Sequence, residues 1–266
     1  MSIPKGKTEY TIDSEKVVAF GISHSQQEME DALCNEVYDK LFDIQEHSEI
    51  VNSLSDTGFD KAIIMEQLFP AEYKEDWEIG EAYAQAYAEA NLQANIPWGI
   101  SRDIKKPKSS LPGADIVGLY QQDEETYFLF GEIKTSSQNK YPPSVMHGEH
   151  GLKKQLEDLC EDKKTTDKLV QYLANRLKNS ELWSKFSNAF VHYMASEGKK
   201  VHILGVLVRD VKPKEEDFST RAKKLEKFVV DGRTIELVGI YVPINSVEKF
   251  PQIVLEENER RSAYDA

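Results

Sequence analysis

Apolar positions in the first hundred residues alternate between the spacing of strands and the spacing of helices. Residues 10–12 and 17–20 are short apolar runs that predict two strands. Residues 26–47 carry apolar side chains three or four positions apart, which predicts an amphipathic helix. A short helix is expected over residues 60–68 and an alanine-rich one over residues 77–90. The small side chains of the alanine-rich helix favour close packing against a sheet.

The remainder of the chain is dominated by strand-length segments and one long helical region. The predicted strands are residues 98–104, 114–120, 127–135, 201–209 and 234–242. The run 201–209 is apolar without alternation, which is typical of a central strand covered on both faces. Helical spacing over residues 151–196 predicts three helices, and residues 218–229 predict another. From Ser246 onward we expect a charged tail.

The order of these elements predicts a single α/β unit. With 266 residues the chain is long enough to bury a sizeable core. We expect an acidic N-terminal elaboration over residues 1–75 and a central α/β core over residues 76–245. A helical insertion at residues 151–197 interrupts the core, and residues 246–266 form the tail.

Composition narrows the class of protein. The chain is 40% hydrophobic and 30% charged, as is usual for a globular chain, and its apolar runs fall short of the ~20 residues of a membrane-spanning helix. The N-terminus has no apolar segment of the kind found in secretory signals. Two cysteines, Cys34 and Cys160, cannot make a disulfide framework or a four-ligand zinc site. We therefore expect a cytoplasmic protein with no membrane association.

Charge is distributed unevenly along the chain. The first 100 residues contain 20 acidic and 6 basic residues, a net charge of −14, whereas the whole chain has a net charge of −13. The remaining residues are therefore close to neutral, with local basic clusters. Because phosphate contacts dominate affinity for nucleic acids, any such binding must be local, metal-assisted or helped by a partner.

The strongest chemical signal is Asp115, at the end of Pro112-Gly113-Ala114-Asp115, followed by Glu132-Ile133-Lys134. Glu132 and Lys134 are two apart on a predicted strand, so both side chains project from one face. A hairpin can bring Asp115 beside them. Two carboxylates can hold a divalent cation such as Mg²⁺, and an adjacent ammonium can orient water or stabilise charge on a phosphate. These groups suffice for phosphodiester cleavage.

Charged residues on a strand often mark nothing more than a solvated face. Here the neighbouring side chains are apolar on both strands: Ile116, Val117 and Leu119 on the first, and Phe128, Leu129, Phe130 and Ile133 on the second. Burying Asp, Glu and Lys in such strands is costly unless they serve each other or a metal. The pattern therefore favours a catalytic site.

Asp115 and the Glu132-Ile133-Lys134 segment resemble the motif of the PD-(D/E)XK nuclease superfamily. The resemblance implies a restriction-endonuclease-like α-β-β-β-α-β core with a mixed sheet, here over residues 77–209. The proline precedes Asp115 by three positions where the motif has one. The resemblance also implies Mg²⁺ (or Mn²⁺) as cofactor and DNA as substrate, although the metal chemistry does not exclude RNA.

Further residues follow from the resemblance alone. Many superfamily members place a glutamate on the first core helix as a metal ligand, and Glu81 is the best match, with Glu78 one turn earlier as the alternative. RecB-like members carry a glutamine on the helix after the lysine strand, which corresponds to Gln155. The tyrosine expected four residues later in that subgroup is Leu159 here, which weakens the match.

Four short phrases are similar to the nuclease subunits of the Hachiman antiphage defence system. They are Trp77-Glu78-Ile79-Gly80-Glu81, Pro112-Gly113-Ala114-Asp115, Gly131-Glu132-Ile133-Lys134-Thr135-Ser136 and Pro142-Pro143-Ser144-Val145-Met146. This similarity implies a DNase restrained by a partner helicase/ATPase of superfamily 2. The alternatives are a stand-alone restriction or repair endonuclease, and an inactive relative that binds a partner or nucleic acid.

Other candidate motifs are less specific. His147 and His150 flank Glu149 but lack the helical spacing of a zinc protease, so a substrate-contacting or structural loop is the better interpretation. Lys105, Lys106 and Lys153 flank motif elements and are candidate phosphate contacts. The chain has neither a phosphate-binding GxxxxGK[ST] loop nor a serine nucleophile elbow, so it is not expected to hydrolyse ATP.

Overall fold

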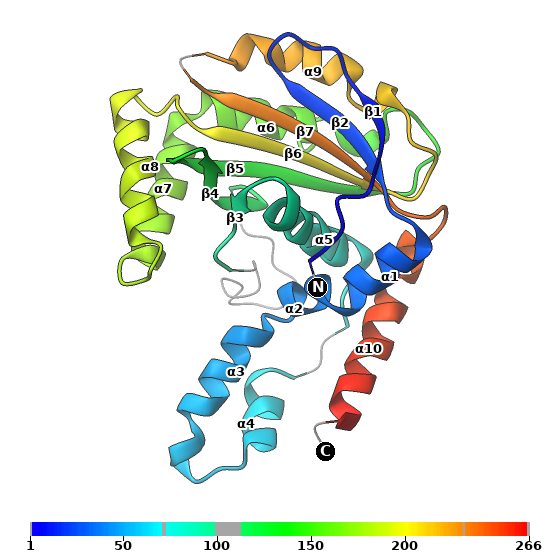
Figure 1. Cartoon of the computed structure of the whole chain (residues 1–266), viewed down its shortest axis with the longest axis vertical. Coiled ribbons are helices and arrows are strands. Elements are labelled where there is room, and N and C mark those ends of the chain that lie inside the picture. The colour runs from blue at the N-terminus through cyan, green and yellow to red at the C-terminus, as the bar shows by residue number, and fades with distance from the viewer. Residues whose placement is uncertain (1, 71–72, 99–112, 231, 265–266) are drawn as a thin grey trace.

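The computed structural model describes residues 2–70, 73–98, 113–230 and 232–264. Within these residues the chain builds a seven-stranded mixed sheet in the order β1-β2-β7-β6-β5-β4-β3 (Figure 1). The strands are β1 Lys7–Thr11, β2 Val18–Ser23, β3 Ala94–Asn95, β4 Ile116–Gln122, β5 Glu125–Ser136, β6 His202–Arg209 and β7 Thr234–Tyr241. The α/β class predicted from the sequence is confirmed.

Parallel and antiparallel pairing divide the sheet. Strands β2, β7, β6 and β5 run parallel, whereas β1 pairs antiparallel with β2, and β4 pairs antiparallel with both β5 and β3. All eight residues of β6 are buried, as expected for the apolar run 201–209. The parallel strands therefore form the centre of the molecule, with antiparallel strands on both sides.

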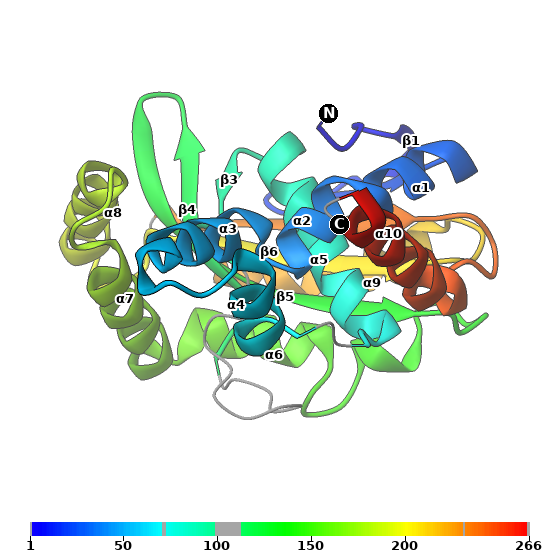
Figure 2. The same ribbon diagram turned by 90° about the horizontal axis from the view of Figure 1, so that it is seen from below.

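Helices cover both faces of the sheet. They are α1 Gln26–Cys34, α2 Glu36–Leu41, α3 Ile44–Ser53, α4 Lys61–Leu68, α5 Asp76–Asn91, α6 Leu152–Glu161, α7 Lys163–Leu177, α8 Trp183–Ala195, α9 Ser219–Leu225 and α10 Phe250–Tyr264. One hydrophobic core joins α1, α2, α5 and α10 to the first face, and a second joins α6, α7, α8 and α9 to the other (Figures 1 and 2). The result is a three-layer α/β/α arrangement.

Helix α5 lies unusually close to the sheet. Its buried alanines present little bulk, and a Cβ added at Gly80 would lie 2.0 Å from Oγ1 of Thr135 on β5. No side chain larger than hydrogen fits at this position, so Gly80 permits the close approach. The neighbouring Glu81 is thereby placed beside the end of β5.

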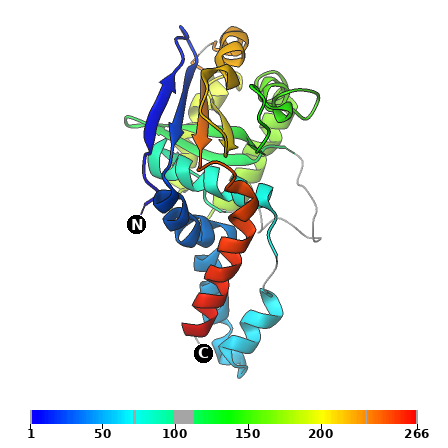
Figure 3. The same cartoon turned by 90° about the vertical axis from the view of Figure 1, so that its right-hand side faces the viewer.

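The predicted helix over residues 26–47 is wrong as a single element. Asn35 has a non-helical backbone between α1 and α2, and Asp43 adopts a left-handed conformation, φ 50°, between α2 and α3. The three resulting helices keep the predicted apolar spacing, and the breaks let α1 and α2 pack on the sheet while α3 extends away from it (Figure 3).

The charged segment after Ser246 is largely a helix, α10, packed onto the domain. Phe250 and Val254 are buried in the core with α1 and α5. Arg261 donates to Asp39 Oδ1 at 2.6 Å and to Glu257 Oε1 at 2.6 Å. The ion pair between Arg261 and Asp39 therefore attaches α10 to α2. The segment expected to be a tail is part of the folded unit.

The first core strand predicted from the sequence, residues 98–104, lies outside the described residues from position 99 onward. The short strand β3 pairs antiparallel with β4 through Ala94 and Asn95. In the described part of the chain no helix is long and apolar enough to cross a membrane.

Candidate active site

Glu132 and Lys134 lie side by side on β5, as their spacing predicts. They are paired with Gly205 and Leu207 of β6, and a Cβ at Gly205 would meet Leu156 of α6 at 2.7 Å. Because paired residues of neighbouring strands share a face, Glu132 and Lys134 project on the side that α6 covers. The ammonium Nζ of Lys134 donates to Oε1 of Glu132 at 2.6 Å.

Burial differs sharply between these two side chains. The side chain of Glu132 is 2% exposed, whereas that of Lys134 is 22% exposed. A buried carboxyl therefore lies behind an ammonium that reaches solvent. This is the polarity required if an anionic substrate approaches from outside while a cation is held within.

Asp115 immediately precedes β4 and is attached to both neighbouring elements. Its Oδ2 accepts the backbone N–H of Ile133 at 2.9 Å, and its backbone carbonyl accepts from Nε2 of Gln85 on α5 at 2.9 Å. The carboxyl of Asp115 is thus held against β5 between Glu132 and Lys134. Gln85 has no role in the sequence interpretation, although it lies one helical turn after Glu81 on the same face, and this spacing could have identified it.

The two glutamates left as alternatives on α5 have different surroundings. Glu78 closes the N-terminus of the helix, because its Oε2 accepts the backbone N–H of Glu75 at 2.9 Å. Burial and repulsion from Asp115 and Glu132 raise the pKa of Glu81 to about 9. Of these two glutamates, Glu81 is therefore the one whose pKa is shifted by the charged groups of Asp115 and Glu132. We refer to Glu81, Asp115, Glu132 and Lys134 as the carboxylate–lysine cluster.

The cluster combines three carboxyls with one ammonium, and ionising all three carboxyls together is unfavourable. Burial, repulsion from Asp115 and hydrogen bonding between the two carboxyls raise the pKa of Glu132 to about 8, and Lys134 only partly opposes this. If all three carboxyls are ionised, the single ammonium of Lys134 does not balance their negative charge. A divalent cation has the charge that such a set of groups lacks.

The donor set suits a hard cation. Carboxylate oxygens are the ligands that Mg²⁺ prefers, and Mg²⁺ commonly uses one or two carboxylates together with water and substrate oxygens. Asp115 and Glu132 make that pair. No group of three His, Cys, Asp or Glu side chains in the described residues is arranged as a complete metal-binding set. Glu81 lies near enough to the pair for the charges of Asp115 and Glu132 to raise its pKa.

The remaining predicted residues are less closely involved. Gln155 lies on α6 next to Leu156, and its Oε1 is buried with no hydrogen-bond partner among the described residues. Lys153 is paired with Glu157 at 2.8 Å. Lys105 and Lys106 lie outside the described residues, as does Pro112.

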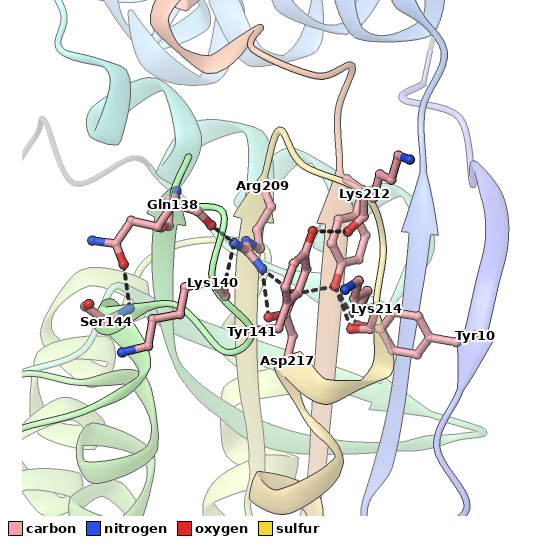
Figure 4. Close-up of polar contacts among 11 residues, drawn as sticks. Tyr10, Gln138, Lys140, Tyr141, Ser144, Arg209, Lys212, Lys214 and Asp217 are labelled. Atoms are coloured by element: carbon pink, nitrogen blue, oxygen red, sulfur yellow. Dashed lines mark hydrogen bonds and ion pairs between the residues drawn. The ribbon is translucent and has the colours of Figure 1, made fainter.

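A buried ion pair fixes the loop that follows Lys134 (Figure 4). Arg209, at the end of β6, donates from Nη1 to both carboxylate oxygens of Asp217 at 2.8 and 2.7 Å, and both side chains are 0% exposed. Its Nη2 donates to the backbone carbonyls of Gln138 and Lys140. We call this arrangement the Arg209 clamp, and it joins the loop after β5 to the segment before α9.

Aromatic side chains complete the clamp. Tyr241 donates to Oδ2 of Asp217 at 2.7 Å, and its hydroxyl lies 2.9 Å from that of Tyr10. The ring of Tyr141 lies over the guanidinium of Arg209, with 4.8 Å between the guanidinium carbon and the ring centroid. The ends of β5, β6 and β7 are therefore joined by one buried polar network.

Comparison of the chain with protein-family models, with curated proteins and with solved structures finds no match. The function is therefore argued from the carboxylate–lysine cluster and its surroundings. The cluster combines buried oxygen ligands, an exposed ammonium and rigid support from α5, β4 and β5. This combination is suited to chemistry on an anionic, phosphate-containing substrate.

Proposed function

We propose that the protein is a magnesium-dependent deoxyribonuclease, which hydrolyses phosphodiester bonds at the carboxylate–lysine cluster. The observation that carries the proposal is the Asp115–Glu132 carboxyl pair, in which Glu132 is buried and has the Lys134 ammonium 2.6 Å away. Buried titratable groups with strongly shifted pKa values are typical of active sites. Mn²⁺ is expected to replace Mg²⁺.

The order of elements around the cluster supports the same proposal. Helix α5, strands β3, β4 and β5, helix α6 and strand β6 follow one another along the chain, with α5 and α6 on opposite faces. Strands β4 and β5 are antiparallel, and β6 lies parallel to β5. This is the α-β-β-β-α-β order that the resemblance to the PD-(D/E)XK superfamily implies, with α7 and α8 as an insertion.

Each residue of the cluster has a separate role in the proposed reaction. Asp115 and Glu132 would hold the ion, with Glu81 as the additional ligand that the resemblance implies. When bound, the ion supplies Lewis acidity and lowers the pKa of water. The ammonium of Lys134 stabilises negative charge that builds on the phosphate and orients the attacking water. Burial of Glu132 strengthens these interactions because little water competes.

The proposal is tested by incubating the purified chain with supercoiled plasmid, linear duplex and single-stranded RNA in separate reactions. We expect nicking or degradation of DNA in Mg²⁺ or Mn²⁺ and none in EDTA. Equal cleavage in EDTA would exclude the metal-dependent mechanism. Degradation confined to the RNA reaction would replace DNA by RNA as the substrate.

We further propose that the nuclease works with a partner helicase that contacts the α3–α4 arm, residues 44–68. The arm extends away from the sheet in the same direction as α10 (Figures 1 and 3). Helix α4 buries only Ile64, whereas Phe59 is 66% exposed, Ile63 57% and Leu68 48%. Apolar side chains gathered on a projecting element are typical of a protein-binding site.

Charge indicates what kind of surface the arm fits. Residues 44–68 contain five acidic residues and one lysine. A second copy of a chain with net charge −13 is repelled by such an arm, whereas an apolar groove bordered by Lys and Arg attracts it. Helicases bind polyanions and carry basic surfaces for that purpose.

Substitution of Phe59, Ile63 and Leu68 together by serine is expected to weaken association with a co-expressed superfamily-2 helicase at least tenfold. The control replaces Val191 and Met194 on α8, which are 64% and 59% exposed, by serine. Association is measured by analytical ultracentrifugation and folding by circular dichroism. Equal affinity of both variants and the native chain would exclude the arm as the contact.

A further inference from the structure

Arg221 on α9 is nearly buried yet makes no ion pair with any described residue. It is 9% exposed, and its Nη2 lies 3.1 Å from each ring nitrogen of His147. Its Nε is buried and has no hydrogen-bond partner in the described chain. Asp217 acts on it electrostatically, but the two carboxylate oxygens of Asp217 already accept from Arg209 and Tyr241.

The surroundings of this guanidinium add positive charge. Burial lowers the pKa of His147, and repulsion from Arg221, Lys140 and Lys224 lowers it further. Within the described residues Lys140, Arg221 and Lys224 form no ion pair. Three cations therefore act on one imidazole, and none of the three is ion-paired with a described residue, although the whole chain has a net charge of −13.

This group of cations lies close to the carboxylate–lysine cluster. His147 belongs to the loop that joins β5 to α6, and Arg221, Lys153 and Leu156 surround one small gap between α6 and α9. Leu156 in turn packs over Gly205, the partner of Glu132. One helix, α6, thus contacts both the gap that Arg221 lines and the strand pair that carries Glu132.

We propose that Arg221 and His147, with Lys140 and Lys224, form an anion site that binds a backbone phosphate of the nucleic acid flanking the scissile bond. The proposal rests on the nuclease function and names how that site holds its substrate.

The chemistry of these side chains fits phosphate better than a carboxylate-bearing protein. A guanidinium presents a planar set of donors that matches phosphate oxygens. Low hydration of a nearly buried arginine strengthens each contact. The chain as a whole is acidic and repels a polyanion such as DNA. A local group of cations of this kind allows the chain to bind DNA despite that repulsion.

The Arg209 clamp holds both halves of the anion site in place. On one side it binds the carbonyls of Gln138 and Lys140, which precede His147 in the same loop (Figure 4). On the other side it binds Asp217, two residues before α9 begins. The site is therefore preformed, and a bound phosphate gains affinity because little ordering is required.

The test measures binding of a fluorescent 30-base-pair duplex by anisotropy with Ca²⁺ in place of Mg²⁺, using the full chain at several salt concentrations. We expect Arg221→Gln to weaken binding about tenfold and to reduce the slope of log K against log salt by about 0.9. Arg221→Lys should recover part of the affinity. The control Lys223→Gln, on an exposed position of α9, should leave binding unchanged.

Because Arg221 is nearly buried, the exposed variants His147→Ala and Lys224→Gln serve as an independent test, each with an expected loss of threefold or more. Native affinity in all of these variants would overturn the anion site, even if the chain cuts DNA. Absence of measurable duplex binding by the native chain would overturn it as well. Weaker binding by the variants of a chain that cuts no DNA would support the anion site while the nuclease function fails.

Discussion

We expect Lys134→Met to lower metal-dependent DNA cleavage by about 10³-fold without unfolding the protein. Removing one preorganised donor that stabilises transition-state charge typically costs 10²–10³-fold in rate. Lys134 also donates to Glu132 at 2.6 Å, so its loss frees that carboxyl to take up a proton. The pKa of Glu132 is already raised to about 8, so the neutral form is tolerated in the fold. The methionine retains an apolar stem of similar length.

Glu132→Gln separates ion binding from the role of the ammonium. We expect this variant to lose both cleavage and Mn²⁺ binding, whereas Lys134→Met loses cleavage and still binds Mn²⁺. Isothermal titration with Mn²⁺ and plasmid cleavage measured on the same preparations distinguish the two roles. Glu78→Gln, which affects the helix cap of α5, is the matched control and should keep both properties. Native cleavage by Lys134→Met would show that the lysine has no catalytic role.

Asp217→Ala is expected to destabilise the fold by 3–5 kcal/mol, which is the usual cost of breaking a buried ion pair. Arg209 and Asp217 are both 0% exposed, so the substitution leaves a guanidinium in the core without its counter-charge. Tyr241 also loses its acceptor. At ~2–4 °C per kcal/mol for a chain of this size, Tm should fall by about 10 °C. Urea denaturation and differential scanning calorimetry both measure the change.

Two further variants test the physical reason for this loss. Asp158→Asn removes one partner of the half-exposed Lys154–Asp158 pair on α6 and should leave Tm nearly unchanged. The double variant Arg209→Met/Asp217→Leu replaces the buried pair by apolar side chains and should regain much of the stability lost in Asp217→Ala. A cost below 1 kcal/mol for Asp217→Ala would contradict a structural role for the Arg209 clamp.

Local patterns predicted the central strands and the residues they carry. The i, i+2 spacing of Glu132 and Lys134 placed both on one face of β5, and a hairpin was enough to bring Asp115 beside them. The apolar run 201–209 became the fully buried strand β6. These predictions depend on side-chain periodicity over short stretches, which a sequence contains directly.

Predictions that needed backbone detail were less successful. The apolar spacing of residues 26–47 was compatible with one helix, but Asn35 and Asp43 interrupt it. The charged character of α10 suggested a tail because its few core contacts, such as Phe250 and Val254, are outnumbered by polar residues. In both segments, packing against the rest of the molecule determined the backbone conformation, and it overrode the conformation that the local sequence favours.

By itself, the sequence determined the α/β class, the central strands, and the proximity of Asp115, Glu132 and Lys134, because these depend on neighbours along one hairpin. Only the tertiary structure decided which glutamate of α5 approaches the cluster, how Arg209 joins Gln138 to Asp217, and where Arg221 meets His147. Such contacts join residues more than 70 positions apart in two of these cases. Their pairing follows from how the helices pack on a shared sheet, and no local pattern of residues encodes that packing.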